Sequence, residues 1–154
     1  MNRHTFLKLT GLVAALAFAG TTVAGEKATA PEAEAMVKKA AAYFKANGAE
    51  KALEEISNGK TFKDRDLYVF VYDMNGKCVA HGANAKMIGK DLIGMKDPDG
   101  KPLVKMLVDV AKDKGQGWTE PVKFRNPTTD KIQMRVNYVE RVGEYAVGSG
   151  YFKD

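Results

Sequence analysis

Cysteine and histidine are scarce in this chain of 154 residues, which has one cysteine, Cys78, and two histidines, His4 and His81. A single cysteine excludes an intrachain disulfide framework, a four-cysteine zinc site and the paired-cysteine motif that attaches haem covalently. The sequence also lacks a G-x-S-x-G nucleophile motif and a glycine-rich phosphate loop before a helix. We therefore expect no enzymatic activity, no cofactor and no metal site.

Long hydrophobic runs are lacking too, except near the start of the chain. The apolar run Leu9 to Ala19 has 11 residues, whereas a membrane-spanning helix needs about 20. Two basic residues precede this run, and the small residue Ala24 follows it, which is the pattern of an export signal. We interpret residues 1–24 as a cleavable signal peptide, with an uncleaved anchor as the alternative, and residues 25–154 as one domain.

Charge is not concentrated in one region of the sequence. The whole chain has a net charge of +5, and without residues 1–24 it has 22 basic and 19 acidic side chains, a net charge of +3. The basic residues alternate with acidic ones instead of forming a stripe, so we expect no nucleic-acid partner. Removal of the signal also leaves His81 as the only histidine.

Three helices are predicted from apolar spacing and from residues that begin or end helices. The first spans Ala28 to Gly48, where Thr29 and Glu32 have the spacing of a capping box. A shorter helix follows and ends at Asn58, and a third extends from Pro102 to Gly115.

Five strands are predicted around and after these helices. They are residues 67–72, 77–81, 117–124, 131–141 and 145–152. The short links between them are typical of hairpins, which predicts an antiparallel five-stranded sheet. With helices on both of its faces, the domain belongs to the α+β class.

One face of the first strand is aromatic. Because side chains alternate along a strand, Tyr68, Phe70 and Tyr72 share one face and the aliphatic residues between them share the other. His81 lies on the paired strand, near the aromatic face. Aromatic walls with a few polar anchors favour a small-molecule pocket. The alternatives are that the aromatic residues are simply core and that His81 is structural.

Three residues of the later strands are added to this candidate pocket, namely Trp118, Arg135 and Tyr138. Arg135 would suit a carboxylate, because its planar guanidinium can donate two parallel hydrogen bonds. It could instead be a surface charge on an edge strand. Strand alternation also places Arg135 and Tyr138 on opposite faces unless a bulge intervenes.

Cys78 and His81 have a C-x-x-H spacing, which invites a metal or redox interpretation. Residues three apart on a regular strand point to opposite faces, so we expect these two side chains to diverge. We interpret Cys78 as a small buried apolar residue.

An ordered set of motifs resembles the single Cache domain family. The motifs are the hairpin 68–81, Ile88-Gly89-Lys90-Asp91-Leu92, the turn 96–100, Gly115-x-Gly117-Trp118, Tyr138-Val139-Glu140 and Gly148-x-Gly150-Tyr151. The resemblance implies a PAS-like sensor domain outside the cytoplasm. A long N-terminal helix would cover one face of its five-stranded antiparallel sheet, and loops and helices would form a ligand pocket on the other.

The resemblance also implies pocket residues and partners. His81, Trp118 and Tyr138 match positions typical of the family's pocket region, and Arg135 stands where such sequences often have lysine. The sequence ends at Asp154, just past the last predicted strand, so we expect a free-standing periplasmic domain. Its signal would then pass to a membrane receptor or a sensor kinase, and a homodimer could form through the N-terminal helix.

The resulting hypothesis is a periplasmic protein that binds and senses a small carboxylate. Tyr68, Phe70 and Trp118 would form the walls, and the polar anchors would be His81, Arg135 and Tyr138. One alternative is a ligand-free interaction module that acts through the N-terminal helix. Another is a haem or redox protein with His81 as an axial ligand.

Overall fold

A computed structural model describes residues 27–153, so the signal predicted for residues 1–24 lies outside the described part of the chain. The helices are α1 (Ala30–Asn47), α2 (Ala49–Asn58), the 3-10 turn η1 (Ala85–Met87) and α3 (Leu103–Asp113). The strands are β1 (Lys63–Asp64), β2 (Leu67–Asp73), β3 (Cys78–His81), β4 (Gln116–Trp118), β5 (Val122–Arg125), β6 (Ile132–Val142) and β7 (Tyr145–Lys153). Within this range, none of the helices combines the length and hydropathy that crossing a bilayer requires.

The sheet is antiparallel, and its centre has the order β2-β7-β6. On one side β3 and the short β1 both pair with β2, and on the other β4 and β5 both pair with β6. The strand predicted over residues 117–124 is therefore divided in two at Thr119–Pro121. Its interior Pro121 has no N–H for a ladder hydrogen bond, which accounts for the division. The α+β prediction is confirmed.

Helix α1 begins at the predicted capping box. The backbone N–H of Thr29 donates to Glu32 Oε2 at 2.7 Å, which satisfies a donor that the helix itself cannot. The helix ends before Gly48, whose φ of 85° favours glycine. Its buried face contains Val37 and Phe44 and lies against the sheet.

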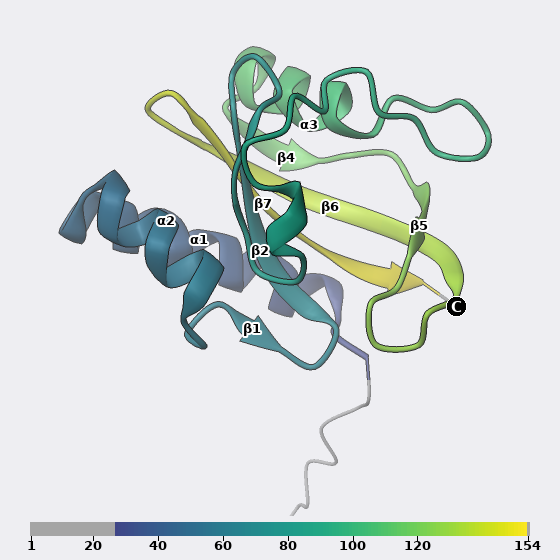
Figure 1. Cartoon of the computed structure of the whole chain (residues 1–154), viewed down its shortest axis with the longest axis horizontal. Coiled ribbons are helices and arrows are strands. Elements are labelled where there is room, and N and C mark those ends of the chain that lie inside the picture. The colour runs from purple at the N-terminus through teal and green to yellow at the C-terminus, as the bar shows by residue number, and fades with distance from the viewer. Residues whose placement is uncertain (1–26, 154) are drawn as a thin grey trace, which may run out of the picture.

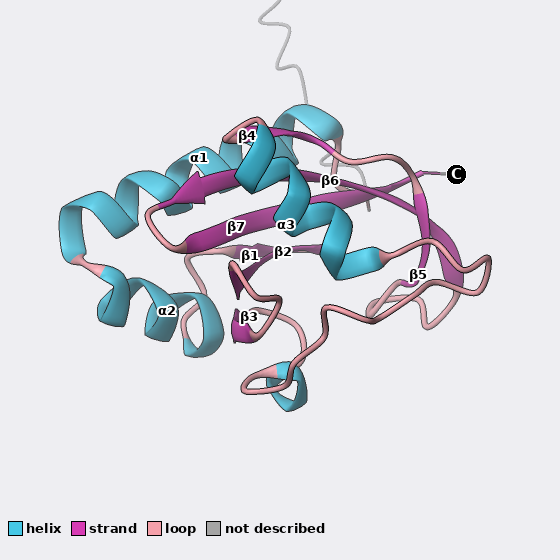
Figure 2. Ribbon diagram, turned by 90° about the horizontal axis from the view of Figure 1, so that it is seen from above, coloured by secondary structure: helices cyan, strands magenta, loops and turns pink. Residues whose placement is uncertain are grey.

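Strand β2 separates two hydrophobic layers. Val69 and Val71 pack with α1 and α2, whereas Tyr68, Phe70 and Tyr72 pack with the α3 side of the molecule. Figure 1 shows α1 and α2 together on one side of the sheet, and α3 with the long loop before it on the other. Figure 2 shows the same division from above. The predicted alternation along this strand is confirmed.

The predicted divergence of Cys78 and His81 is wrong. The register between β2 and β3 shifts at a bulge, so that Cys78 lies opposite Tyr72 and His81 lies opposite Phe70. Because a bulge inserts an extra residue, here Val79, it brings both side chains to the aromatic side of β2. Cys78 is buried there, and burial raises the pKa of its thiol to about 11.

The loop between β3 and α3 is fastened to β5 by Asp97. One carboxylate oxygen of Asp97, Oδ1, accepts from the backbone N–H groups of Asp99 and Lys101, each at 2.9 Å. The other, Oδ2, accepts from the backbone N–H of Lys123 in β5 at 3.0 Å. Both carboxylate oxygens are thus used to hold the loop to the strand.

Candidate ligand-binding pocket

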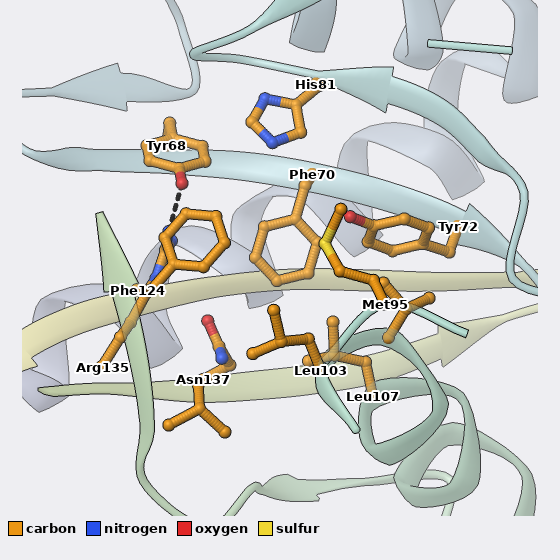
Figure 3. A pocket seen from close by; sticks show the side chains of 12 residues that line it. Tyr68, Phe70, Tyr72, His81, Met95, Leu103, Leu107, Phe124, Arg135 and Asn137 are labelled. Carbon is orange, nitrogen blue, oxygen red and sulfur yellow. Dashed lines mark hydrogen bonds between the residues drawn. The ribbon is translucent and has the colours of Figure 1, made fainter. Parts of the chain in front are cut away.

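A cavity of about 30 Å³ lies between the aromatic face of the sheet and α3 (Figure 3). It is lined by Tyr68, Phe70, Tyr72, His81, Met95, Leu103, Val104, Leu107, Val122, Phe124, Arg135 and Asn137. Four of the six residues predicted to bind a ligand line this cavity: Tyr68, Phe70, His81 and Arg135. The lining is mostly apolar and, among the described residues, includes no carboxylate.

Arg135 is the only charged side chain in that lining. It lies on β6 with 2% of its surface exposed. The alternative that Arg135 is a surface charge on an edge strand is therefore wrong. Its Nη1 donates to the hydroxyl of Tyr68. Its Nε and Nη2 are buried and have no hydrogen-bond partner among the described residues. Buried donors without partners are costly and uncommon, which makes this guanidinium a candidate binding group.

Aromatic rings surround the guanidinium. Arg135 Cζ lies 4.4 Å from the ring centroid of Tyr68, 5.1 Å from Phe152, 5.5 Å from Phe124 and 5.6 Å from Phe70. These cation–π contacts offset part of the cost of burying the charge. They do not replace the carboxylate that a buried arginine ordinarily pairs with, so the positive charge remains uncompensated.

The imidazole of His81 is neutral, and its remaining N–H can donate a hydrogen bond to a ligand. Its Nδ1 accepts from the backbone N–H groups of Ala83 at 3.1 Å and Asn84 at 2.9 Å, so its proton belongs on Nε2. Burial, with the nearby charges of Arg135 and Lys63, lowers the pKa of His81 to about 4. Figure 3 shows its ring beside Tyr68 and Phe70, and the ring centroids are 5.1 Å and 6.4 Å apart.

Three of the polar side chains that line the cavity present donors, and Asn137 adds an amide with both a donor and an acceptor. Arg135 supplies Nε and Nη2, His81 supplies Nε2–H, and the hydroxyl of Tyr68, which accepts from Arg135, can donate its O–H in turn. The opposite wall is apolar, with Leu103 and Leu107 of α3. Donors at one side and apolar side chains at the other suit an anionic head group on a short apolar tail.

Two glycines of β7 make room for this arrangement. A Cβ at Gly148 would lie 2.5 Å from the ring of Phe70. A Cβ at Gly150 would lie 2.3 Å from Asn137 Oδ1 and 2.7 Å from Arg135 Nε. Glycine at these two positions leaves the space that the side chains of Phe70, Asn137 and Arg135 occupy against β7.

Trp118 and Tyr138 do not line the cavity, contrary to our expectation. They pack on the opposite face of the sheet, with ring centroids 5.2 Å apart, beside Tyr151 and α1. Strand alternation explains Tyr138, since it is three residues from Arg135 and no bulge intervenes in β6. Trp118 lies opposite Tyr138 in the register, so it shares that face.

Several lining residues were missed by the sequence analysis. Asn137 is two residues from Arg135 on the same strand, so alternation alone could have found it. Phe124 is two residues after Val122, which lies opposite Arg135. Met95 comes from an irregular loop, where no periodicity indicates which side chains point inward.

A second, larger cavity of about 230 Å³ adjoins the first. The two have Tyr68, His81 and Phe124 in common. The rest of the second lining comes from the loop after β3 and from the turn between β5 and β6, namely Ala83, Asn84, Met87, Arg125 and Pro127. We call the first the inner cavity and the second the outer chamber.

Comparison with known proteins gives relatives among bacterial receptors. The sensor histidine kinase MctS of Rhizobium johnstonii is 28% identical over 92 residues, which are 58% of this chain and 20% of the kinase. The chain thus spans about a fifth of the length of that curated relative.

Two solved structures have the same fold. A methyl-accepting chemotaxis protein from Vibrio parahaemolyticus is 21% identical, with a TM-score of 0.69 over 80% of this chain and 88% of that one. A Cache chemosensory domain studied for its recognition of carboxylic acids is 22% identical, with a TM-score of 0.62 over 79% of this chain and 86% of that one. The sequence model for single Cache domain 2 matches residues 21–152, and the chain therefore belongs to this family of sensor domains.

Proposed function

We propose that this domain binds a small monocarboxylate in the periplasm, with Arg135 as the anchor of the carboxylate. The observation that carries the proposal is a buried guanidinium whose two nitrogens Nε and Nη2 have no partner among the described residues, beside a cavity without an acidic group. A carboxylate would supply both the missing charge and the missing acceptors.

The donor set favours a carboxylate over other small ligands. A cation would meet Arg135 without any compensating acid, and like charges in a buried site repel strongly. A neutral ligand would leave the charge of Arg135 unbalanced. The small inner cavity favours a compact acid whose tail contacts the apolar wall.

The ligand-bound state would be read by a membrane receptor or sensor kinase. The export pattern of residues 1–24 and the relatives among chemoreceptors and kinases support this part of the proposal. The related Cache domain studied for carboxylic acid recognition supports the ligand class. The proposed role is ligand recognition, with no chemical change to the ligand.

Thermal unfolding of the purified protein tests the proposal. Formate, acetate and propionate are each compared with the matching neutral amide, which keeps the shape and removes the charge. A ligand at 100 times its Kd stabilises by about 2.7 kcal/mol, which raises Tm by roughly 5–10 °C in a domain of this size. We expect a rise with at least one acid and none with its amide. Absence of a rise with every acid would refute the proposal.

A further inference from the structure

The wall between the inner cavity and the outer chamber contains one side chain with no polar restraint. Of the three shared residues, Tyr68 is held by its bond from Arg135, and His81 is held by two backbone N–H groups. Phe124 has only its apolar ring, and it is half-buried. Its removal would open the wall without breaking a hydrogen bond.

Phe124 lies on a strand at the margin of the sheet. Strand β5 pairs with β6 alone among the described strands, and Phe124 lies opposite Gln133. Its ring approaches the guanidinium of Arg135, with the ring centroid 5.5 Å from Cζ. Figure 3 shows this ring between Tyr68 and Phe70, in front of Arg135. A carboxylate bound to Arg135 would therefore lie beside Phe124, and a tail too long for the space in front of α3 would have to pass this ring.

The outer chamber suits an apolar tail better than a second charge. Met87, Pro127 and Ala83 contribute apolar surface to its lining. The one charged residue there, Arg125, already pairs with Asp130 at 2.9 Å.

We propose that Phe124 is the specificity-determining residue that sets the longest acid the domain accepts. This inference rests on the proposed function and goes beyond it. With Phe124 in place, the ring closes the inner cavity, and only short acids such as acetate and propionate fit. Without the ring, the inner cavity joins the outer chamber of about 230 Å³, and longer straight-chain acids gain a place for their tails.

Titration calorimetry with straight-chain acids from formate to hexanoate tests this role. For the wild type we expect affinity to decrease beyond propionate. For Phe124→Ala we expect the preference to move to butanoate and longer acids, with a gain of about fourfold for each added methylene that enters the outer chamber. Phe124→Leu is the milder variant, and it decides the question if the alanine variant does not fold.

Phe152→Leu is the matched control. Phe152 also places its ring beside the Arg135 guanidinium, at 5.1 Å, but it lines neither cavity. This variant should keep the wild-type order of acids even if every affinity falls. An unchanged order in the Phe124 variants, or an equal change in Phe152→Leu, would overturn the role of Phe124 and leave the proposed function standing. A wild type that binds no acid would overturn both.

Discussion

Gly150 of β7 lies opposite Asn137, two residues from Arg135 on β6, and so close to the Arg135 guanidinium that no side chain fits at position 150. A Cβ there would lie 2.7 Å from Arg135 Nε and 2.7 Å from the carbonyl oxygen of Val136. The second neighbour is backbone and cannot rotate away. The guanidinium of Arg135 can therefore keep its position only while residue 150 of β7 has no side chain.

Gly150→Ala should damage the site and the fold together. The added methyl group must displace the side chains of Asn137 and Arg135 or the strand itself, and overpacking of this kind costs about 1–3 kcal/mol. We expect a lower Tm and loss of the rise in Tm with carboxylates. Gly94→Ala is the control, because a Cβ at Gly94 meets nothing within 4 Å. Equal effects of the two substitutions would contradict the explanation.

Arg135→Met should separate stability from binding. Methionine fills a similar volume without a buried charge, and replacing a buried ionic group by an apolar one is often neutral or stabilising, by about 1–4 kcal/mol. We therefore expect the ligand-free Tm to stay the same or rise while the response to carboxylates disappears. Arg141→Met serves as a control, since Arg141 is 41% exposed and bonds to a backbone oxygen. A retained carboxylate response in Arg135→Met would exclude Arg135 as the anchor.

His81 should make the protein less stable in mild acid. Its pKa is lowered to about 4 in the folded state, from 6.5 in the unfolded state, so the unfolded chain binds the extra proton first as the pH falls. The free energy of unfolding should therefore be unaffected by His81 above pH 6.5 and decrease by about 3 kcal/mol between pH 6.5 and 4. Denaturant unfolding at several pH values measures this slope. In His81→Gln, whose side chain does not titrate, the slope in that window should flatten; an unchanged slope would assign it to other groups.

Asp97→Asn should loosen the loop that covers the pocket. The amide has one acceptor oxygen instead of two, so the N–H groups of Asp99 and Lys101 or that of Lys123 lose their partner. Loss of such bonds to a charged group costs about 1–3 kcal/mol, and carboxylate affinity should fall with it. Asp99→Asn is the comparison, because its ion pair with Lys123 is exposed and should contribute little. Comparable losses in Tm would argue against Asp97 as the fastening point.

The fold was largely predictable because its elements have strong local patterns. The capping box of Thr29 and Glu32 marks the start of α1, and the alternation along β2 assigns its two faces correctly. The interruption between β4 and β5 was missed, although Pro121 lies in the middle of the predicted strand. Local signals therefore indicated most of the sheet.

The site was predictable only where it follows from strand alternation. Tyr68, Phe70 and Arg135 line the cavity, as the alternation and register of their strands indicate. Trp118 and Tyr138 do not line it, although the family resemblance implied that they would, because alternation puts them on the other face. The bulge at Val79 could not be foreseen, because no glycine or proline marks it, and it changes where Cys78 points. Met95 lies in a loop, where tertiary packing alone decides which side chains face inward.

The alternation in β2 also has a consequence for how such a domain can diversify. Phe70 lines the inner cavity, and its neighbours Val69 and Val71 contact the helices behind the sheet. A substitution at Phe70 would therefore change the lining of the inner cavity and leave the packing of Val69 and Val71 on the helices in place, and the reverse holds for Val69 and Val71. One short strand thus couples two hydrophobic layers whose residues can be substituted separately.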